Sequence, residues 1–193
     1  MAYPQFPHAT YDEWRNAVNG QFVDIDGQYG AQCWDGVCAL YVQNDINQYL
    51  YTAYNVGQGD GTAKSCWINA DARARNASGH FSAVSDKTQI KKGDAIVFNT
   101  YSGWYGSSGH IGFADEDYNG TDYIQLLSEN FGTGSNPQTG KAFNIQRAYL
   151  GSAFLGAFRY DAWQQPTPPP PPPVVTQKRK SFPFPIAWNN WWN

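Results

Sequence analysis

Residues 23–35 have the sequence Val-Asp-Ile-Asp-Gly-Gln-Tyr-Gly-Ala-Gln-Cys-Trp-Asp, which passes from a glycine-rich loop into an expected helix. Cys33 lies at that junction, where the first backbone N–H groups of a helix have no partner within the helix and where the helix dipole is positive. Both features favour a thiolate over a thiol. The same N–H groups can bind the oxyanion that forms when a thiolate attacks a carbonyl group. We therefore expect Cys33 to be a nucleophile.

Helices are predicted in the first half of the chain. The segment Thr10-Tyr-Asp-Glu13 matches a capping box, which marks the start of a helix. A second helix is expected over residues 33–51, because apolar residues recur at a spacing of three and four positions from Trp34 to Tyr41. Cys38, on this helix but about 140° around it from Cys33, is expected to be buried, as is Cys66.

The second half of the chain has the pattern of short strands separated by turns rich in Gly, Asn and Ser. Helices followed by antiparallel strands are typical of an α+β fold, in which the two kinds of element are segregated. The expected strands are Asp94–Asn99, His110–Ala114, Tyr123–Leu127 and Phe154–Tyr160.

A cysteine nucleophile needs a general base, and histidine is the usual one. His8 follows a proline near the start of the chain and His80 lies in a polar run, so both are expected to face solvent. His110 begins an apolar strand directly after a glycine, and its ring can face a helix packed on the sheet. A third group, which holds the tautomer of the imidazole, is expected from residues 127–131, at the end of the next strand.

Four short motifs now give a resemblance to a known family. QCWD around Cys33, GDAIVF at 93–98, GHIGF around His110 and SEN at 128–130 resemble the CHAP domain of bacteriophage endolysins and related cell-wall hydrolases, over about residues 10–160. The resemblance implies a papain-like (NlpC/P60-like) α+β fold, with N-terminal helices packed on a small antiparallel sheet. It also implies hydrolysis of amide bonds in peptidoglycan through a thioester on cysteine.

Carried over by position, the resemblance makes Cys33 the nucleophile and His110 the general base. Many family members have an acid, one spacer residue and then Asn, and here that Asn matches Asn130 while the acid position falls on Ser128. A shift of one residue would place Glu129 there instead. Residues 128 and 130 of a strand point to one side and residue 129 to the other, so the two alternatives exclude each other. Glu129 and Asn130 are retained as equal candidates to orient His110.

The loop before Cys33 carries alternating carboxylates around a glycine turn, which is the beginning of an EF-hand-like calcium loop. The resemblance implies a Ca²⁺ site here. Its carboxylate ligands would be Asp24, Asp26 and Asp35, with Gln28 and Gly30 as backbone or side-chain ligands. The alternative is a solvated acidic turn in which Asp24 and Asp35 cap the helix.

Composition divides the chain of 193 residues into three parts. Residues 1–161 are expected to form the catalytic domain, residues 162–177 a stiff proline-rich linker, and residues 178–193 a short basic and aromatic tail that contacts the cell envelope. All 16 acidic residues lie in the first part, together with only 10 of the 13 basic ones. An acidic domain is a poor ligand for nucleic acid. No apolar run is long enough to insert stably in a membrane.

These features favour a phage-type lytic enzyme that hydrolyses peptidoglycan as an amidase or an endopeptidase. The first residues, MAYPQFPHATYDEW, lack the pattern of a secretory signal. The protein is therefore expected in the host cytoplasm until a holin releases it to the cell wall, or in the virion. Two alternatives stay open: an envelope-binding protein without catalysis, and a papain-like protease that acts on proteins. The oligomeric state does not follow from the sequence.

Overall fold

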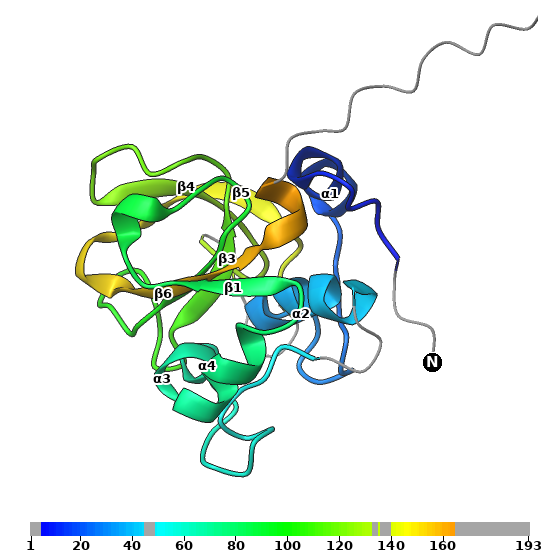
Figure 1. The fold of residues 1–193 in the computed structure, drawn as a ribbon, viewed down its shortest axis with the longest axis vertical. Helices are drawn as coiled ribbons and strands as arrows, with labels where there is room; N and C mark the ends of the chain where they lie inside the picture. The colour runs from blue at the N-terminus through cyan, green and yellow to red at the C-terminus, as the bar shows by residue number, and fades with distance from the viewer. Residues whose placement is uncertain (1–4, 45–48, 133–134, 136–139, 165–193) are drawn as a thin grey trace, which may run out of the picture.

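The computed structural model describes residues 5–44, 49–132, 135 and 140–164. Its centre is a six-stranded antiparallel sheet with the strand order β1-β6-β2-β3-β4-β5 (Figure 1). The strands are β1 (Phe81–Val84), β2 (Ala95–Phe98), β3 (His110–Ala114), β4 (Tyr123–Ser128), β5 (Asn144–Tyr149) and β6 (Phe154–Tyr160). The α+β class expected from the sequence is confirmed.

In Figure 1, α1 lies at the upper right, α2 lies below it and to the right of β1, and α3 and α4 lie at the bottom, below the sheet. Three single 3₁₀ turns complete the described elements, at Lys87–Gln89, Gly151–Ala153 and Asp161–Gln164. The helices are α1 (Tyr11–Val18), α2 (Cys33–Asn44), α3 (Ser65–Ile68) and α4 (Ala70–Asn76).

The capping box at the start of α1 is confirmed. Thr10 is the N-cap and accepts a hydrogen bond from the Glu13 backbone, while the Glu13 side chain accepts one from the Thr10 backbone. The helix expected over residues 33–51 is shorter than predicted, because α2 ends at Asn44. Residues 49–51 are not helical, and the Tyr51 backbone N–H donates to the side chain of Asn76. The apolar pattern continues past the helix because the segment that follows it is also buried, at residues 50, 52 and 53.

The four expected strands correspond to β2, β3, β4 and β6, with differences of at most one residue at an end. The sequence did not predict β1 or β5. β1 has only four residues, Phe81–Val84. β5 has the mixed sequence NIQRAY and lies at an edge of the sheet, where polar side chains can remain partly exposed. Neither strand has the alternation that identifies a half-buried strand.

Apolar side chains fill both faces of the sheet. One cluster lies between the helices and the sheet and includes Trp14, Tyr41 and Phe113. The other covers the opposite face and includes Phe98, Tyr105 and Leu126. Helix α2 is buried on all sides from Val37 to Val42, which explains why it lacks a clear polar face.

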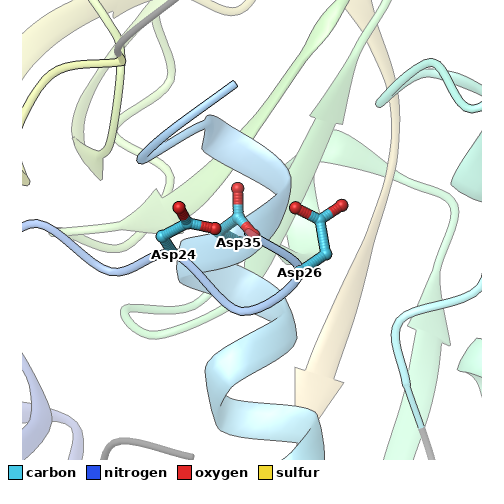
Figure 2. Close-up of side chains that lie close together, drawn as sticks. All are labelled: Asp24, Asp26 and Asp35. Atoms are coloured by element: carbon cyan, nitrogen blue, oxygen red, sulfur yellow. The ribbon is translucent and has the colours of Figure 1, made fainter. Parts of the chain in front are cut away.

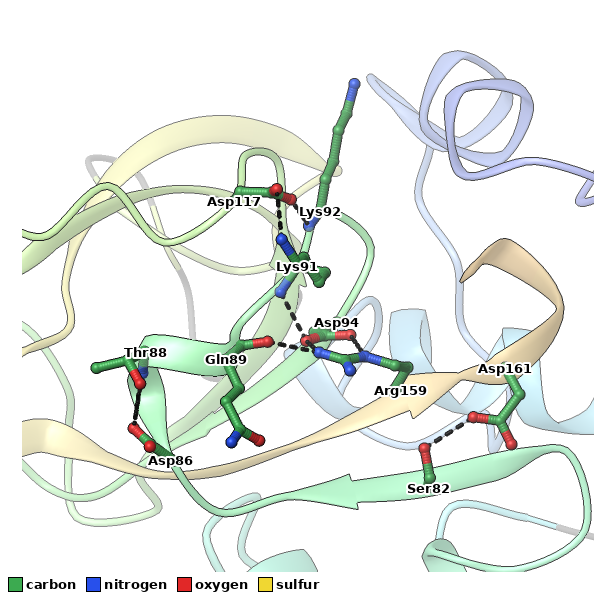
Figure 3. Close-up of polar contacts among 10 residues, drawn as sticks. All are labelled: Ser82, Asp86, Thr88, Gln89, Lys91, Lys92, Asp94, Asp117, Arg159 and Asp161. Carbon is green, nitrogen blue, oxygen red and sulfur yellow. Dashed lines mark hydrogen bonds and ion pairs between the residues drawn. The ribbon is translucent and has the colours of Figure 1, made fainter. Parts of the chain in front are cut away.

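A buried ion pair joins the start of β2 to β6 (Figure 3). Arg159 forms two hydrogen bonds with the carboxylate of Asp94, Nε to Oδ1 at 2.9 Å and Nη2 to Oδ2 at 2.7 Å. Asp94 Oδ2 also accepts the backbone N–H of Lys91, 2.9 Å away. This bidentate geometry satisfies both oxygens of a fully buried carboxylate. Asp94 of the GDAIVF motif therefore has a structural role, because it ties the start of β2 to β6 through Arg159.

The expected linker at 162–177 and the tail at 178–193 lie outside the described residues, apart from the three residues that begin the linker. Within the part of the chain that the structure describes, every helix is too short or too polar to span a bilayer.

Candidate active site

Cys33 is the first residue of α2, and α2 packs against strand β3 of the sheet. Two glycine-assisted turns lead into the helix, and Tyr29 and Gly30 both adopt positive φ angles, 62° and 67°. The backbone N–H groups of Ile111 on β3 and of Trp34 donate hydrogen bonds toward the Cys33 sulfur. The thiol is half-buried and is not in a disulfide. The predicted location of Cys33 at the start of a helix is confirmed.

His110 is the first residue of β3, opposite Phe98 on β2. Gly109 makes the turn before it with a φ of 67°, and a Cβ atom there would lie 2.3 Å from the Phe98 carbonyl oxygen. Only glycine allows this close approach. The ring of His110 is surrounded by aromatic side chains, with centroids of Phe131 and Tyr105 at 4.7 Å and 5.8 Å.

Cys33 and His110 line the same groove, which has a volume of about 1080 Å³. Helix α2, strand β3 and the loop at 103–109 all contribute to it. The lining residues are Tyr29, Gln32, Cys33, Trp34, Gly61, Thr62, Ala63, residues 103–110, Asn130, Phe131, Gly132, Ser135, Gln146 and Arg147. The structure thus brings together the nucleophile and the base that the sequence predicted.

A single hydroxyl group holds the imidazole of His110. Nε2 of His110 lies 2.7 Å from Oγ of Ser128, and this Oγ lies 2.9 Å from the Ile111 carbonyl oxygen. Because a hydroxyl has one hydrogen and a carbonyl can only accept, Ser128 donates to Ile111 and accepts from His110. This network favours the tautomer with the hydrogen on Nε2 and with Nδ1 as the acceptor atom.

Glu129 does not contact His110. Its side chain turns away from the groove and is fully buried, where Oε1 accepts the Val23 backbone N–H at 2.7 Å. Its Oε2 has no hydrogen-bond partner among the described residues. The strand alternation noted above explains the outcome, because residue 129 faces the opposite side from Ser128. The interpretation of Glu129 as the residue that orients the imidazole is therefore wrong.

Asn130 lies in the groove, one residue past the buried Glu129. Its Nδ2 donates to Oε1 of Gln32 at 2.6 Å, and Gln32 directly precedes Cys33. Asn130 has a φ of 47°, a conformation that Asn tolerates better than most residues. The hydrogen bond described for the His110 ring goes to Ser128, so a role for Asn130 in orienting His110 stays a prediction.

Burial determines the charge state of the resting pair. Burial raises the pKa of the Cys33 thiol to about 12, with additional repulsion from Asp35 and Glu129, although the N–H groups of Ile111 and Trp34 oppose this. Burial alone lowers the pKa of His110 to about 3. Burial therefore favours the neutral thiol and the neutral imidazole. It opposes the effect of the helix N-terminus on Cys33, so a thiolate at this position stays a prediction.

Asp24, Asp26 and Asp35 form a cluster, with one carboxylate oxygen of each within 4.8 Å of the others (Figure 2). Asp24 and Asp26 are exposed on the loop, whereas Asp35 is buried in the first turn of α2. Both oxygens of Asp35 accept backbone N–H groups, from Ile25 at 2.9 Å and Gln32 at 3.1 Å. Burial raises the pKa of Asp35 to about 7, with the neighbouring Asp26 and Asp24 adding to the effect.

The donor set fits a hard divalent cation. The three carboxylates converge, and none of them forms an ion pair with a basic side chain of the described residues. One oxygen of Asp24 accepts the Gly27 backbone N–H and one oxygen of Asp26 accepts the Gln28 backbone N–H, which leaves the second oxygen of each for other ligands. Calcium prefers such a ligand set of six to eight oxygens. Gln28 and Gly30 lie on the same loop as Asp24 and Asp26, and their part in binding an ion stays a prediction. The residues predicted as metal ligands are therefore close together.

The groove includes residues that the sequence analysis did not select as site residues. Ser128 was noted only as the position where an acid was missing, although a hydroxyl can accept the same hydrogen bond. Gln32 and Arg147 were not selected, and no local pattern marks Arg147, because β5 was itself not predicted. Cys38 and Cys66 are buried in the core cluster, as expected.

Together, the fold and the groove define an α+β protein with a cysteine at a helix start and a histidine on the adjacent strand. No family model matches the chain. The chain is 30% identical over 151 residues to the D-alanyl-L-alanine endopeptidase of Streptococcus phage B30. The aligned region covers 78% of this chain and 30% of that protein. The chain thus spans less than a third of the length of this relative.

The fold is similar to that of a solved endolysin. The wild-type endolysin LysIME-EF1 superposes with a TM-score of 0.55 and 21% identity, covering 78% of this chain and 63% of the other. The structure of Ly7917 with the hydrolysing product of MDP gives a TM-score of 0.48 and 11% identity, covering 80% and 62% of the two chains. The six-stranded sheet and its helices therefore have a fold similar to that of LysIME-EF1.

Proposed function

We propose that this protein is a phage-type lytic enzyme that hydrolyses peptide bonds of peptidoglycan with Cys33 as nucleophile. The observation that carries the proposal is that Cys33 and His110, from separate elements of a papain-like arrangement, line one groove. The similarity to a phage D-alanyl-L-alanine endopeptidase supports an endopeptidase acting on a D-alanyl–L-alanine bond, in preference to an amidase. The four CHAP-like motifs lie within the matched region and support a CHAP-type catalytic domain.

The first half of the reaction begins with two neutral groups. As the substrate carbonyl enters the groove, Nδ1 of His110 accepts the proton of the Cys33 thiol, and the sulfur attacks the carbonyl carbon of D-alanine. The bond between that carbon and the amide nitrogen breaks. The departing amine takes the proton from His110, which leaves a thioester on Cys33 and a neutral ring.

Backbone donors near Cys33 stabilise the tetrahedral intermediate. The N–H of Cys33 itself has no hydrogen-bond partner among the described residues, and as the first helical residue it is one of the unpaired donors of α2. An oxyanion placed there receives this N–H and the favourable end of the helix dipole. Loss of one such donor typically costs about 10²–10³ in rate.

Water completes the cycle. His110 accepts a proton from water, which attacks the thioester carbon; the carbon–sulfur bond breaks and the proton returns to Cys33. The hydroxyl of Ser128 keeps Nε2 protonated through both halves, so that Nδ1 remains the working atom. Asn130 and Gln32 shape the groove beside the nucleophile through their mutual hydrogen bond.

Calcium has a structural role in this proposal. Asp24, Asp26 and Asp35, with oxygens of Gln28 and Gly30, would hold the ion. When bound, it neutralises clustered carboxylates and fixes the loop that leads into Cys33. The chain's own contribution is the pair of backbone hydrogen bonds from Ile25 and Gln32 to Asp35, which tie this loop to the first turn of α2.

The remaining parts of the proposal concern the whole chain. Residues 1–161 would be the catalytic domain, joined by the linker 162–177 to a tail at 178–193 that contacts the envelope. The enzyme would act on the cell wall after release by a holin, or from the virion.

The decisive experiment is digestion of purified Gram-positive cell walls, followed by mass spectrometry of the new termini. Wild-type protein should release fragments with a new amino terminus on L-alanine and a new carboxyl terminus on D-alanine. Cys33→Ala should reduce this release by about 10³-fold or more while leaving the fold intact. A liberated lactyl carboxyl group in place of these termini would indicate an amidase.

Cys38→Ala is the matched control, because Cys38 lies on the same helix but is buried in the core away from the groove. This variant should retain activity, with at most a modest loss of stability. If Cys33→Ala still lyses walls, the thiol mechanism is wrong. If wild-type protein binds walls without releasing fragments, the protein is an envelope-binding protein. Cleavage of casein without cleavage of walls would indicate a general protease.

A further inference from the structure

Arg147 is the only acidic or basic side chain, other than the neutral His110, among the described residues that line the groove. It lies on edge strand β5, is exposed, and forms no ion pair with any described residue. No Asp, Glu or Lys side chain is among the described residues that line the groove. A lone guanidinium in an otherwise uncharged groove favours a ligand that carries a negative charge.

Aromatic contacts hold this guanidinium in place. Its Cζ lies 3.8 Å from the ring centroid of Tyr123, which is a close cation–π contact. The Tyr123 ring in turn lies 5.9 Å from that of Trp104, which lines the groove and is 37% exposed. A guanidinium stacked on a ring keeps its N–H edges free, and a planar fork of this kind matches a carboxylate in a bidentate pair.

The sheet register relates the backbone position of Arg147 to that of Ser128, the residue that contacts His110. Arg147 lies opposite Gln125 on β4, three residues before Ser128, which contacts His110. Three residues of extended strand span about 10 Å. An extended peptide bound in the groove covers the same distance with about three residues.

We infer that Arg147 and Trp104 form a specificity subsite for a free carboxylate of the substrate peptide, about three residues from the scissile bond. Arg147 receives the carboxylate, and Trp104 provides an apolar surface for the aliphatic part of the residue that carries it. The inference rests on the proposed peptide substrate. It goes further by stating that the enzyme distinguishes an ionised side group from its amide at that position.

Binding to a catalytically silent protein tests the subsite independently of cleavage. Two synthetic peptides with the same D-alanyl–L-alanine bond would be compared by calorimetry on Cys33→Ala. One carries a free carboxylate three residues from the bond and the other carries a carboxamide there. The carboxylate peptide should bind at least 10-fold more tightly, and rising salt should reduce the difference because screening weakens ion pairs.

Arg147→Gln, made in the Cys33→Ala protein, should bring the two affinities within twofold of each other. Trp104→Ala should weaken both peptides to a similar extent and retain the preference. The matched control is Arg75→Gln, because Arg75 is also exposed and packs on a tyrosine ring, 5.2 Å from the centroid of Tyr51, outside the groove. This control should keep the full preference.

Equal affinity of Cys33→Ala for the two peptides, or no measurable binding of either, overturns the subsite. A preference that survives Arg147→Gln overturns it as well. Failure of the proposed function has a different signature, because wild-type protein would then bind the carboxylate peptide selectively yet leave it and purified walls uncleaved.

Discussion

His110 Nε2 lies 2.7 Å from Ser128 Oγ, so a neutral hydroxyl stands where an acid or an amide was expected. The hydroxyl is committed as a donor to the Ile111 carbonyl and therefore accepts from the ring. Among the described residues no carboxylate offsets the burial of His110, and burial lowers its pKa. The contact with Ser128 thus bears on the tautomer of the ring, whereas burial sets its charge.

Ser128→Ala should lower kcat by about 10–100-fold, because the ring loses the group that holds its tautomer and orientation. KM should change little, since Ser128 does not line the groove. Steady-state kinetics on wall fragments measure both parameters. Ser82→Ala is the control, as it also removes a hydrogen-bonded hydroxyl, here to Asp161, remote from His110. An unchanged kcat in a folded Ser128→Ala protein would contradict this role.

The pH dependence of activity should reflect the buried imidazole. A general base must be unprotonated, and a His110 pKa of about 3 leaves the ring neutral throughout the range above pH 5. The acid limb of kcat/KM should therefore lie below pH 5, measured with calcium in large excess. Ser128→Asp should move this limb to higher pH, because a carboxylate stabilises the imidazolium. A wild-type limb at pH 6.5 or above would show that the ring is solvated.

Calcium should stabilise the protein through the carboxylate cluster. A ligand that binds the folded state alone adds about 2.7 kcal/mol at 100 times its Kd, which corresponds to a rise of several degrees in Tm. Asp26→Asn should remove most of this rise, and EDTA should lower wild-type Tm and activity. Asp12→Asn is the control, because Asp12 is exposed and pairs only with Lys92. A Tm that does not respond to calcium would exclude the metal site.

Glu129 should make stability depend on pH. Its folded pKa is raised to about 9, mainly by burial, so the folded state binds more protons than the unfolded state between about pH 4.5 and pH 9. Stability should therefore fall as pH rises through this window. Glu129→Gln keeps an acceptor for the Val23 N–H and removes the ionisation, so it should exceed wild type at pH 8 by about 1 kcal/mol or more.

Urea unfolding at pH 5 and pH 8, in EDTA, measures this difference. The two proteins should agree closely at pH 5, where the carboxyl of Glu129 is protonated. Glu116→Gln is the matched control, because it also replaces an acid that accepts a backbone N–H, here from Gln125, at a half-buried position, and it should not alter the slope with pH. If Glu129→Gln is less stable than wild type at pH 8, the buried carboxylate contributes favourably and the argument from burial is wrong.

Much of the architecture was accessible from local patterns. The capping box at Thr10, the helix start at Cys33 and the strand His110–Ala114 depend on turn chemistry and short-range periodicity, which neighbouring residues determine. The α+β class followed from their order. β5 was not predicted because an edge strand can be polar, and the end of α2 was misplaced because both the helix and the returning chain are buried.

The sequence by itself determined which residues carry reactive atoms and roughly where each element begins, because these depend on residue type and on contacts within a few positions. Tertiary structure alone decided that Ser128, and not Glu129, touches His110, that burial opposes the thiolate of Cys33, and that Arg147 shares its groove. Those outcomes depend on burial and on contacts between residues about 15–110 positions apart. A linear pattern does not encode desolvation, and so the charge state of the site became visible only when the sheet and the helix were in place.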